Sequence, residues 1–400
     1  MNISKKSIFR LIIKNKMIMM IVVSIIAAII RFSLIECGGG DYDGFLSEWC
    51  KYINDNGGFN AIKSVKTDYN ALYLYFLALF SYIPIIDLYL IKILSFVFDY
   101  IMAFGMYKLT KECINKKSQI LPLIAYSCTL LMPTVIMNSG EWVQCDSIYV
   151  AFLIWSLYFM ITKKYNTCFI LYGIAITFKL QAIFLFPVYG IIFLKNKEFS
   201  IIKFLLIPLV NFILYIPAIL LGKPILSIYD AYLSQIGHYS YKTVLGYPNI
   251  YYFFNVDKVS LIKPGIYFTM FILLLILVFV MLTKGKLSNN EIIQLSIFVL
   301  FIVPYLLPQM HDRYAYGAEV LSIVYFIMVR KHYTIWLLIN VIAVTIYDSF
   351  LHGVPEDIMI RSACLQFIVV CYFAYEFINK RINNVKINAK VIYNNNMEII

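Results

Sequence analysis

The sequence predicts an all-α protein that crosses a membrane many times. Of its 400 residues, 62% are hydrophobic and only 14% are charged, and the mean hydropathy is +0.78. A soluble domain has no use for that much apolar surface. The apolar residues form long runs separated by short basic connectors. Because backbone polar groups inside lipid must be satisfied within their own segment, we expect each run to be a helix.

The charged connectors decide which apolar runs cross. If every run crossed, starting with the N-terminus inside, the basic connector holding Lys108, Lys111, Lys116 and Lys117 would lie outside, against the positive-inside rule. We therefore predict that residues 71–86 form a juxtamembrane helix on the outer surface, leaving about twelve crossings with both termini in the cytoplasm. The predicted crossings are 17–36, 88–107, 119–137, 145–162, 167–180, 182–194, 201–221, 266–283, 292–307, 315–329, 333–347 and 359–378.

The same pattern sets the domain organisation. No Gly/Ser-rich or Pro-rich linker interrupts residues 1–379, which predicts a single integral domain. Its outer face carries a first loop at 37–70 and a long aromatic loop at 222–265, whose role the sequence leaves open. Residues 380–400 are polar and Asn-rich, so we expect a solvated cytoplasmic tail. The high usage of Asn, Ile, Lys and Tyr favours a bacterial cytoplasmic membrane.

Charge and cysteine usage exclude other classes of protein. The net charge is +12, but the Lys and Arg residues lie mainly in the predicted cytoplasmic connectors, so nucleic acid is not an expected partner. The eight Cys are scattered, with no CxxC pair and no Cys/His cluster, so no metal site and no cofactor is predicted. Cys37 and Cys50 flank the first outer loop, where a disulfide remains an alternative.

Two carboxylates open the first outer loop. Asp41 and Asp43 follow Gly38–Gly40, a triplet that lets the chain turn sharply off the first crossing. In an extended or turn segment both side chains can point into one cavity, where a carboxylate can act as general base on a hydroxyl group. We predict that these two residues are catalytic, and the sequence leaves open which one is the base. The alternative is a solvated acidic loop.

Further polar residues lie beside the predicted outer ends of the crossings. Asp68 precedes the juxtamembrane helix and is either a binding residue or its N-cap. Trp142, Gln144 and Asp146 form a short turn that suits a sugar, with the indole stacking on the ring; the alternative for Asp146 or Ser147 is a helix cap. Polar residues are expensive beside a membrane, so their concentration on one side predicts a site there.

The remaining candidates suit a phosphate. Lys179 and Gln181 interrupt an apolar stretch, where a helix break would turn the lysine toward the site; the alternative is a snorkelling lysine. His311, Asp312 and Arg313 form a late outer turn, in which the planar fork of the arginine matches phosphate oxygens. Their alternative is a local His–Asp or Asp–Arg pair.

Five short motifs, in this order along the chain, resemble those of the GT-C membrane glycosyltransferases. The similarity is to bacterial Gpi18-like mannosyltransferase-related proteins and to dolichyl-phosphate-glucose glucosyltransferases. The chain departs from the family pattern where Asp43 replaces a Glu and where Asn70 and Ala71 replace two prolines. The motifs are Gly40-Asp41-Tyr42-Asp43, Asp68-Tyr69-Asn70-Ala71-Leu72, Glu141-Trp142-Val143-Gln144-Cys145-Asp146, Lys179-Leu180-Gln181 and His311-Asp312-Arg313.

The resemblance implies a GT-C-like bundle and an activity. Such enzymes transfer a hexose with inversion from a polyprenyl-phosphate sugar donor to a lipid-linked glycan or cell-envelope polysaccharide acceptor, here on the outer face and among membrane lipids. It implies Asp41 as the base, with Lys179, Arg313 and His311 stabilising the leaving phosphate. The alternatives are a polysaccharide polymerase or ligase and a lipid-linked glycan flippase. A flippase is disfavoured because only Lys92 and Asp99 are ionisable near the midplane, and we interpret these two as structural.

Overall fold

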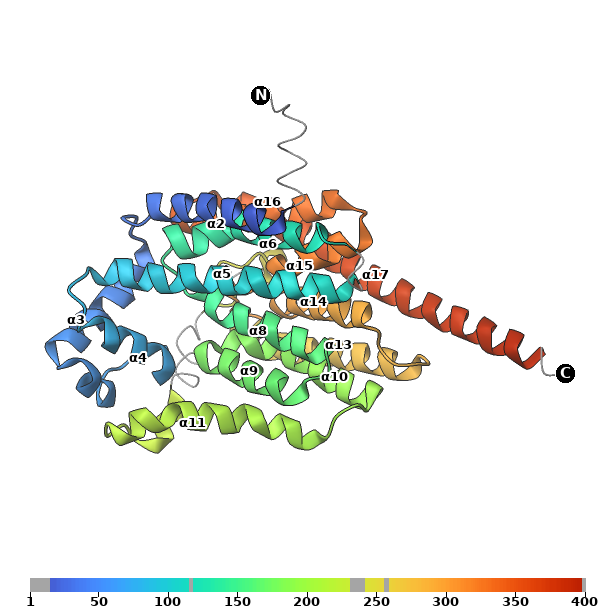
Figure 1. The fold of residues 1–400 in the computed structure, drawn as a ribbon, viewed down its shortest axis with the longest axis horizontal. Helices are drawn as coiled ribbons and strands as arrows, with labels where there is room; N and C mark the ends of the chain where they lie inside the picture. The colour runs from blue at the N-terminus through green and yellow to red at the C-terminus, as the bar shows by residue number, and fades with distance from the viewer. Residues whose placement is uncertain (1–14, 115–117, 231–241, 255–258, 398–400) are drawn as a thin grey trace, which may run out of the picture. The chain divides into compact units, whose positions relative to one another are not determined.

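The computed structural model describes residues 15–114, 118–230, 242–254 and 259–397, which fold into helices and turns with no β-strand (Figure 1). Within these residues, seven helices are long and apolar enough to cross a membrane, and a bent pair of helices makes up to eight. The prediction of an all-α, multi-pass membrane protein is therefore confirmed. The count of about twelve crossings is not, because the other predicted crossings lie on shorter apolar helices.

The chain divides into two compact units, each assembled from separate stretches of sequence. Each unit combines stretches that are far apart in the sequence, so the boundary between the units does not coincide with one linker in the chain. The prediction of one integral domain over residues 1–379 stays a prediction. The first unit comprises Met1–Ala182, Ile202–Tyr239 and Phe326–Lys331, and the second comprises Ile183–Ile201, Ser240–Tyr325 and His332–Ile400.

A row of packed helices forms the body of the first unit. α5 (Asp87–Cys113) lies between α6 (Leu121–Leu131) and α8 (Asp146–Ile161) (Figure 1). α9 (Tyr165–Phe178) continues the row from α8 to α11 (Leu206–Leu220). The side chains that face one another along this row are buried and mostly apolar, which places the core of the unit inside it.

A proline bends the chain where the row meets the candidate site. The first crossing, α2 (Lys16–Ser33), packs against α6. Pro133 then interrupts the helix, since proline removes a backbone donor and clashes with the preceding turn. The short α7 (Pro133–Ile136) and the π-helical turn η3 (Met137–Glu141) leave at 49° to α6. This bend carries the chain to the start of α8.

The segment 37–70, predicted to be the first outer loop, is folded rather than open. Short helices pack on one another there and against α4 (Ala71–Phe80). At ten residues, α4 is about 15 Å long, too short for a hydrocarbon layer of about 30 Å. Its position at the membrane surface stays a prediction. The short helices are η1 (Tyr42–Leu46), α3 (Ser47–Asp55) and η2 (Gly58–Lys63).

The second unit is built around α14 (Asn289–Leu306), which is buried from Glu291 to its end and packs against α10, α13 and α17. Its other elements are α10 (Phe186–Asn196), η7 (Ile250–Phe253), η8 (Val259–Leu261), α13 (Ile262–Leu282), α16 (Tyr333–Leu351) and α17 (Glu356–Met397). The remaining short or shared elements are η4 (Leu180–Leu185), η5 (Ile201–Leu205), η6 (Ile225–Ile228) and α15 (Tyr316–Val329).

Apolar helices with little burial mark the surfaces that face lipid. α2 and α11 in the first unit, and α13 in the second, have high hydropathy, yet most of their residues are not buried within the protein. Large exposed apolar faces on a folded chain indicate an apolar solvent around them. Their exposure therefore agrees with the membrane assignment made from hydropathy.

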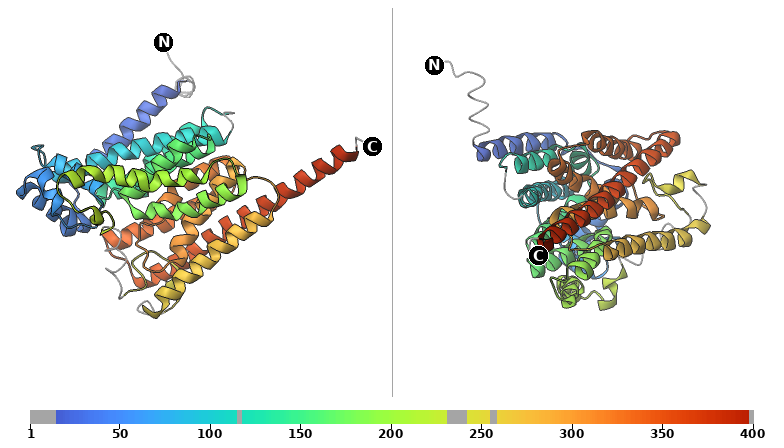
Figure 2. Two further views of the ribbon diagram at one scale, coloured as in Figure 1. Left: turned by 90° about the horizontal axis from the view of Figure 1, so that it is seen from below. Right: turned by 90° about the vertical axis from the view of Figure 1, so that its right-hand side faces the viewer.

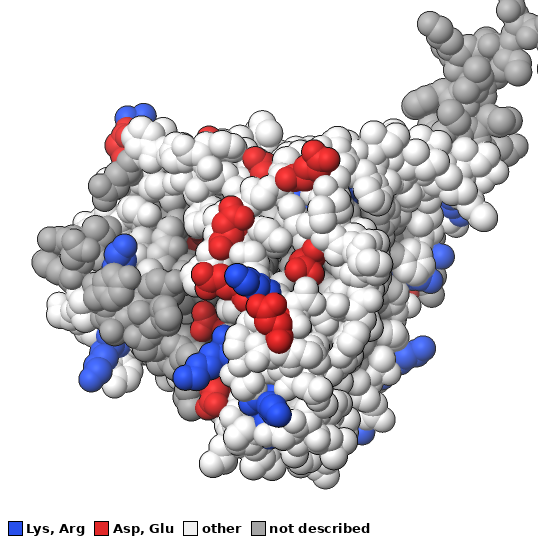
Figure 3. Space-filling model, turned by 90° about the vertical axis from the view of Figure 1, so that its left-hand side faces the viewer, with Lys and Arg blue, Asp and Glu red and all other residues white. Residues whose placement is uncertain are grey.

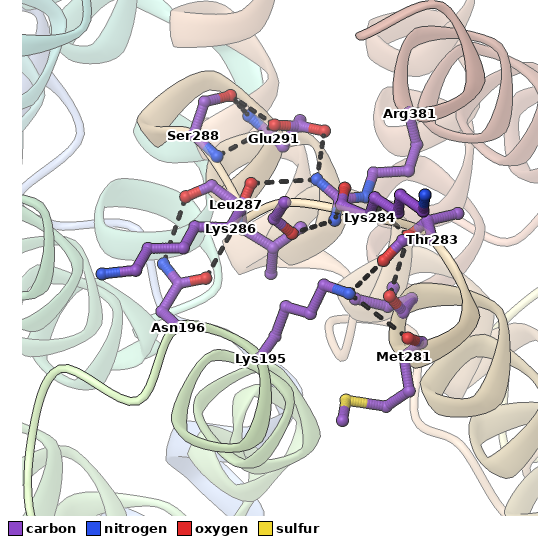
Figure 4. A network of polar contacts seen from close by, with 12 residues as sticks. Lys195, Asn196, Met281, Thr283, Lys284, Lys286, Leu287, Ser288, Glu291 and Arg381 are labelled. Atoms are coloured by element: carbon purple, nitrogen blue, oxygen red, sulfur yellow. Dashed lines mark hydrogen bonds and ion pairs between the residues drawn. The ribbon is translucent and has the colours of Figure 1, made fainter. Parts of the chain in front are cut away.

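One buried arginine fastens α17 to the turn between α13 and α14 (Figure 4). Arg381 donates through Nε to Thr283 Oγ1 at 2.8 Å, and through Nη1 to Glu291 Oε1 at 3.1 Å. Its remaining donors reach the carbonyl oxygens of Lys284, Gly285 and Lys286. α17 runs unbroken through the boundary expected at residue 380 (Figure 2), so the start of the predicted polar tail is helical.

Candidate functional site

The candidate site is built in the first unit around Asp41, just beyond the end of α2. Of the preceding three glycines, Gly39 is the one whose lack of a side chain matters. A Cβ there would lie 3.2 Å from the carbonyl oxygen of Trp142 and 3.4 Å from that of Glu141. None of the three glycines has a positive φ. At Gly39 the missing side chain therefore allows two backbones to pack closely, and it is not needed for an unusual turn.

Two side chains of α5 contact the end of α2 and the segment that follows it. Asp99 accepts from Arg31 Nε at 2.8 Å and from Ser139 Oγ at 2.7 Å, all three buried. Lys92, two helical turns away, donates from Nζ to the carbonyl oxygens of Leu34 and Cys37. The interpretation of Lys92 and Asp99 as structural residues is confirmed, and their contacts position the segment that leads to Asp41.

The turn before α8 supplies the groups that contact Asp41. Trp142 Nε1 donates to Asp41 Oδ2 at 3.2 Å, and Gln144 Nε2 donates to the same oxygen. The turn is shaped by Val143, a β-branched residue with φ of 60°, a strained conformation that such residues rarely adopt. The backbone N–H of Gln144 donates to the backbone oxygen of Asn138 at 2.8 Å, which closes the turn. Trp142 and Gln144 are buried, whereas Asp41 is partly exposed.

Lys179 enters the same cluster because α9 ends at Phe178. Lys179 has extended backbone, with φ −145° and ψ 132°, so its side chain leaves the helix direction, as the sequence predicts. Its Nζ lies 2.6 Å from Asp146 Oδ1 and donates to Gln144 Oε1 at 3.4 Å. It also lies 5.4 Å from the centroid of the Tyr69 ring, within range of a cation–π contact.

Four predicted residues are thus brought together in one connected cluster with Asp41: Trp142, Gln144, Asp146 and Lys179. Asn138 Nδ2 completes it by donating to Asp146 Oδ2 at 2.8 Å. Chemically, the cluster presents one partly exposed carboxylate held by two N–H donors, beside a buried ion pair and aromatic rings. Such a carboxylate can accept a proton from a hydroxyl group placed next to it.

Asp43 does not share this environment. The backbone is helical from Gly40 onward rather than extended, so residues two apart point about 200° apart around the axis. The Asp43 side chain is exposed, and its carboxylate lies near Gly38, where an added Cβ would be 3.9 Å from Asp43 Oδ1. The expectation that Asp41 and Asp43 face one cavity is therefore wrong, and Asp41 is the carboxylate that contacts Trp142 and Gln144.

Two expected helix caps are also wrong. Asn70, not Asp68, caps α4, because Asn70 Oδ1 accepts from the Ala71 backbone N–H at 2.6 Å. Asp68 instead lines a pocket beside the site. At the start of α8, Cys145 occupies the cap position without a side-chain cap, and Asp146 spends both oxygens on Lys179 and Asn138. Neither carboxylate is therefore the helix cap that the sequence offered as the alternative.

Gln181 lies on η4, two residues beyond Lys179. In the part of the chain that the structure describes, its buried Oε1 has no hydrogen-bond partner. Its predicted role in substrate binding stays a prediction.

His311, Asp312 and Arg313 belong to the second unit. Arg313 Nη1 lies 3.4 Å from Asp312 Oδ1, which is the local Asp–Arg pair that the sequence left as the alternative. Part of the 222–265 loop covers this turn: Gln309 N donates to Thr243 O at 2.7 Å, and Tyr247 N donates to Met310 O at 3.2 Å. This gives the described part of the loop a structural role. The phosphate role of the three residues stays a prediction.

Sequence reasoning missed three residues that support the cluster. Arg31 is the lone charged residue inside the first apolar run, a signal that marks a buried partner and was available in the sequence. Asn138 and Tyr69 carry no comparable signal. None of the eight cysteines forms a disulfide in the structure, so Cys37 and Cys50 are not bonded to each other. Among the described residues, no group of three or more His, Cys, Asp or Glu side chains is placed so that it could hold a metal ion.

No model of a known protein family matches this chain, and no curated protein sequence does. The likeness to GT-C glycosyltransferases thus rests on the short motifs and their order.

Proposed function

We propose that the protein is an inverting membrane glycosyltransferase. It moves a hexose from a polyprenyl-phosphate sugar to a lipid-linked glycan or a cell-envelope polysaccharide. The observation that carries the proposal is the connected cluster Asp41–Gln144–Lys179–Asp146, because it joins residues from three of the five motifs through direct contacts. The cluster sets a partly exposed carboxylate beside a buried lysine, which is the pair of groups that the proposed transfer needs.

In this proposal Asp41 acts as general base. The acceptor hydroxyl oxygen attacks the anomeric carbon while its proton passes to the Asp41 carboxylate, and the bond from that carbon to the phosphate oxygen breaks. The bonding pair leaves with the polyprenyl phosphate, and attack opposite the leaving group inverts the anomeric centre. Trp142 and Gln144 fix the carboxylate during this step, and general-base help of this kind contributes about 10²–10⁴ in rate.

The leaving phosphate gains negative charge and needs a fixed positive group. Lys179 is the cation of the cluster, and its ion pair with Asp146 holds Nζ in place at 2.6 Å. A preorganised group of this kind costs no reorganisation as the charge develops. The aromatic side chains Trp142 and Tyr69 lie beside these polar groups, an arrangement that suits the apolar faces and polar edges of a sugar ring.

The topology that we propose puts this chemistry on the outer face of a bacterial cytoplasmic membrane. The seven long helices, the bent pair and the four shorter apolar helices other than α4 provide twelve crossings. The basic connectors then lie in the cytoplasm together with both termini. Asp41 follows the first crossing and so lies outside. Reporter fusions test this arrangement: green fluorescent protein fused at the C-terminus fluoresces, and alkaline phosphatase inserted after Asp55 is active.

The transfer reaction itself is the deciding experiment. Purified protein is incubated with radiolabelled synthetic polyprenyl-phosphate hexoses and a membrane lipid extract, and product is counted. We expect transfer by the wild type and a loss of at least about 10²-fold in Asp41→Asn. Asp43→Asn is the matched control, since it removes a carboxylate from the same helical turn, and we expect it to keep most activity.

Two outcomes would contradict this proposal. Loss of transfer only in Asp43→Asn, with an unchanged melting temperature, would move the base away from the cluster. No transfer by the wild type from any monosaccharide donor would reject the chemistry. Transfer of preassembled oligosaccharides in the same assay would then support the polymerase or ligase alternative.

A further inference from the structure

A cavity lies beside the Asp41 cluster, and its lining residues take no part in the proposed proton transfer. It has a volume of about 540 Å³, within the range of small-molecule sites, and all the residues that line it belong to the first unit. One wall comes from the chain between Lys63 and Ala71, and another from the segment Tyr215–Asp230. Figure 3 shows the face that carries α3 and α4, where acidic and basic side chains gather closely.

Aromatic rings form one side of this cavity. Phe45 and Trp49 lie with ring centroids 6.3 Å apart, and Trp49 meets Tyr69 edge to face at 5.5 Å. Tyr69 connects the cavity to the catalytic cluster, because Lys179 Nζ contacts the same ring. Contiguous aromatic surface beside hydroxyl and carboxylate groups is the usual lining of a saccharide site, with one apolar and one polar face.

The charged side chains of the lining carry an excess of positive charge. Three lysines, Lys63, Lys66 and Lys223, stand against two carboxylates, Asp68 and Asp230. Lys223 is held in position by the carbonyl oxygens of Ile62 at 3.2 Å and Val65 at 3.4 Å. Lys63 and Lys66 are exposed, so they can turn toward a ligand without breaking an internal contact.

We propose that this pocket binds the acceptor, and that it selects a saccharide carrying an acidic group, either a phosphate or a carboxylate. The aromatic wall takes the sugar ring, and Lys63 and Lys66 bind the anion. Tyr69 lines the pocket and also contacts Lys179, so an acceptor bound here lies next to the cluster that holds Asp41. The assignment of the ligand as acceptor rests on the proposed glycosyltransferase activity, whereas binding of an acidic saccharide does not.

Direct binding tests the pocket without any transfer. The full chain is reconstituted in nanodiscs of uncharged lipid, and tryptophan fluorescence is followed during titration with glucose 6-phosphate, glucuronate, glucose or inorganic phosphate at constant ionic strength. We expect the two acidic sugars to bind at least about tenfold more tightly than glucose or inorganic phosphate, as a lost charge-assisted contact costs about that much. Trp49→Phe should remove most of the signal.

The variants separate this pocket from general electrostatics. Lys63→Gln combined with Lys66→Gln should weaken binding of both acidic sugars by about tenfold or more. Lys51→Gln is the matched control, because Lys51 is exposed on α3 and does not line the pocket, and it should bind as the wild type does. Equal binding of glucose, equal binding of inorganic phosphate, or an unchanged double variant would each overturn the proposal.

The catalytic variant keeps the two proposals distinguishable. Asp41→Asn should bind glucose 6-phosphate with unchanged affinity while losing transfer. Binding without any transfer by the wild type would reject the enzyme and leave the acidic-saccharide site standing. Transfer by a protein that binds none of the acidic sugars would reject the pocket and leave the enzyme standing.

Discussion

Asp41 and Lys179, a carboxylate and a cation from distant parts of the chain, are joined through a single side chain. Gln144 donates from Nε2 to Asp41 and accepts at Oε1 from Lys179 at 3.4 Å. Because the two ends of the amide face opposite charges, only one orientation of the Gln144 side chain satisfies both. The base and the phosphate-binding group of the proposed reaction are therefore positioned by the same residue.

Replacing Gln144 should uncouple these two groups. Gln144→Leu keeps the side-chain volume but removes both polar atoms, so Asp41 loses a donor and Lys179 an acceptor. We expect the transfer rate to fall by about 10- to 100-fold, the cost of a misplaced catalytic group. Gln119→Leu, at an exposed site distant in sequence from the cluster, should leave the rate within about twofold of wild type by the same reasoning. Full activity in Gln144→Leu would remove Gln144 from the mechanism.

The Lys179–Asp146 ion pair predicts a pattern of stability changes. Both side chains are at least nine-tenths buried, so Lys179→Met or Asp146→Asn alone leaves an unpaired charge and should cost about 3–5 kcal/mol. The double variant removes both charges and should regain part of that loss while staying inactive. Thermal melting in detergent measures the first effect, and the transfer assay measures the second.

An exposed ion pair provides the control for that cycle. Lys286 and Glu198 lie 3.1 Å apart, with the lysine 63% exposed, so the corresponding substitutions should change stability by only about 0–1 kcal/mol. If the stability losses of Lys179→Met and Asp146→Asn simply added up in the double variant, the two charges would not stabilise each other, and the ion-pair argument would be contradicted.

The space around Gly39 gives a prediction with a close control. Gly39→Ala puts a methyl group 3.2 Å from the Trp142 carbonyl oxygen, so either the segment before Asp41 or the turn at Val143 must move. We expect activity to fall about tenfold, together with a stability loss of about 1–3 kcal/mol. At Gly44, in η1, an added Cβ meets nothing within 4 Å, so Gly44→Ala should be neutral or slightly stabilising. Equal effects at the two positions would refute the packing argument.

Hydropathy predicts the helices well because a segment that crosses a membrane must be apolar over its whole length. The lipid-facing surfaces of α2, α11 and α13 need apolar residues throughout, so these helices are visible as runs in the sequence. The number of crossings is harder to predict. α8 and α9 are shorter than a simple crossing, and length alone does not decide whether such helices span.

The site is predictable where polar residues stand out against an apolar background, as for Gln144, Asp146 and Lys179. Prediction fails where the local backbone decides the outcome. Asp41 and Asp43 look equivalent in sequence, and only the helical turn at η1 points them apart. Likewise the competition between Asp68 and Asn70 for the α4 cap depends on a difference of two residues in where the helix begins.

Replacing Arg381 should destabilise the protein far more than replacing Arg361, the other arginine considered on α17. Arg381 is 1% exposed and makes contacts to three carbonyl oxygens, a hydroxyl and a carboxylate. Arg381→Met should therefore cost about 3–5 kcal/mol, since it leaves Glu291 buried without its cation. Arg361 is 77% exposed in its pair with Asp357, so Arg361→Met should cost at most about 1 kcal/mol. Similar melting temperatures for the two variants would contradict the clamp shown in Figure 4.

Cys50 predicts a loss of stability in alkali. Burial in α3 raises the pKa of its thiol to about 12, with the nearby Asp87 carboxylate acting in the same direction. In the unfolded chain the thiol ionises near its ordinary value of 9.0. Between these values the unfolded chain releases a proton that the folded protein keeps. This contribution to stability is therefore complete below pH 9.0 and is lost as the pH rises toward 12.

Comparison with Cys50→Ala isolates this effect from the tyrosines that also titrate in alkali. Alanine has no proton to lose, so the wild type should lose stability relative to the variant by up to about 1.4 kcal/mol per pH unit above pH 9. Melting temperatures of the two proteins at pH 7.5, 9 and 10.5 measure the difference. Parallel curves over this range would show that the Cys50 thiol ionises as readily in the folded protein as in the unfolded chain, and that α3 does not bury it.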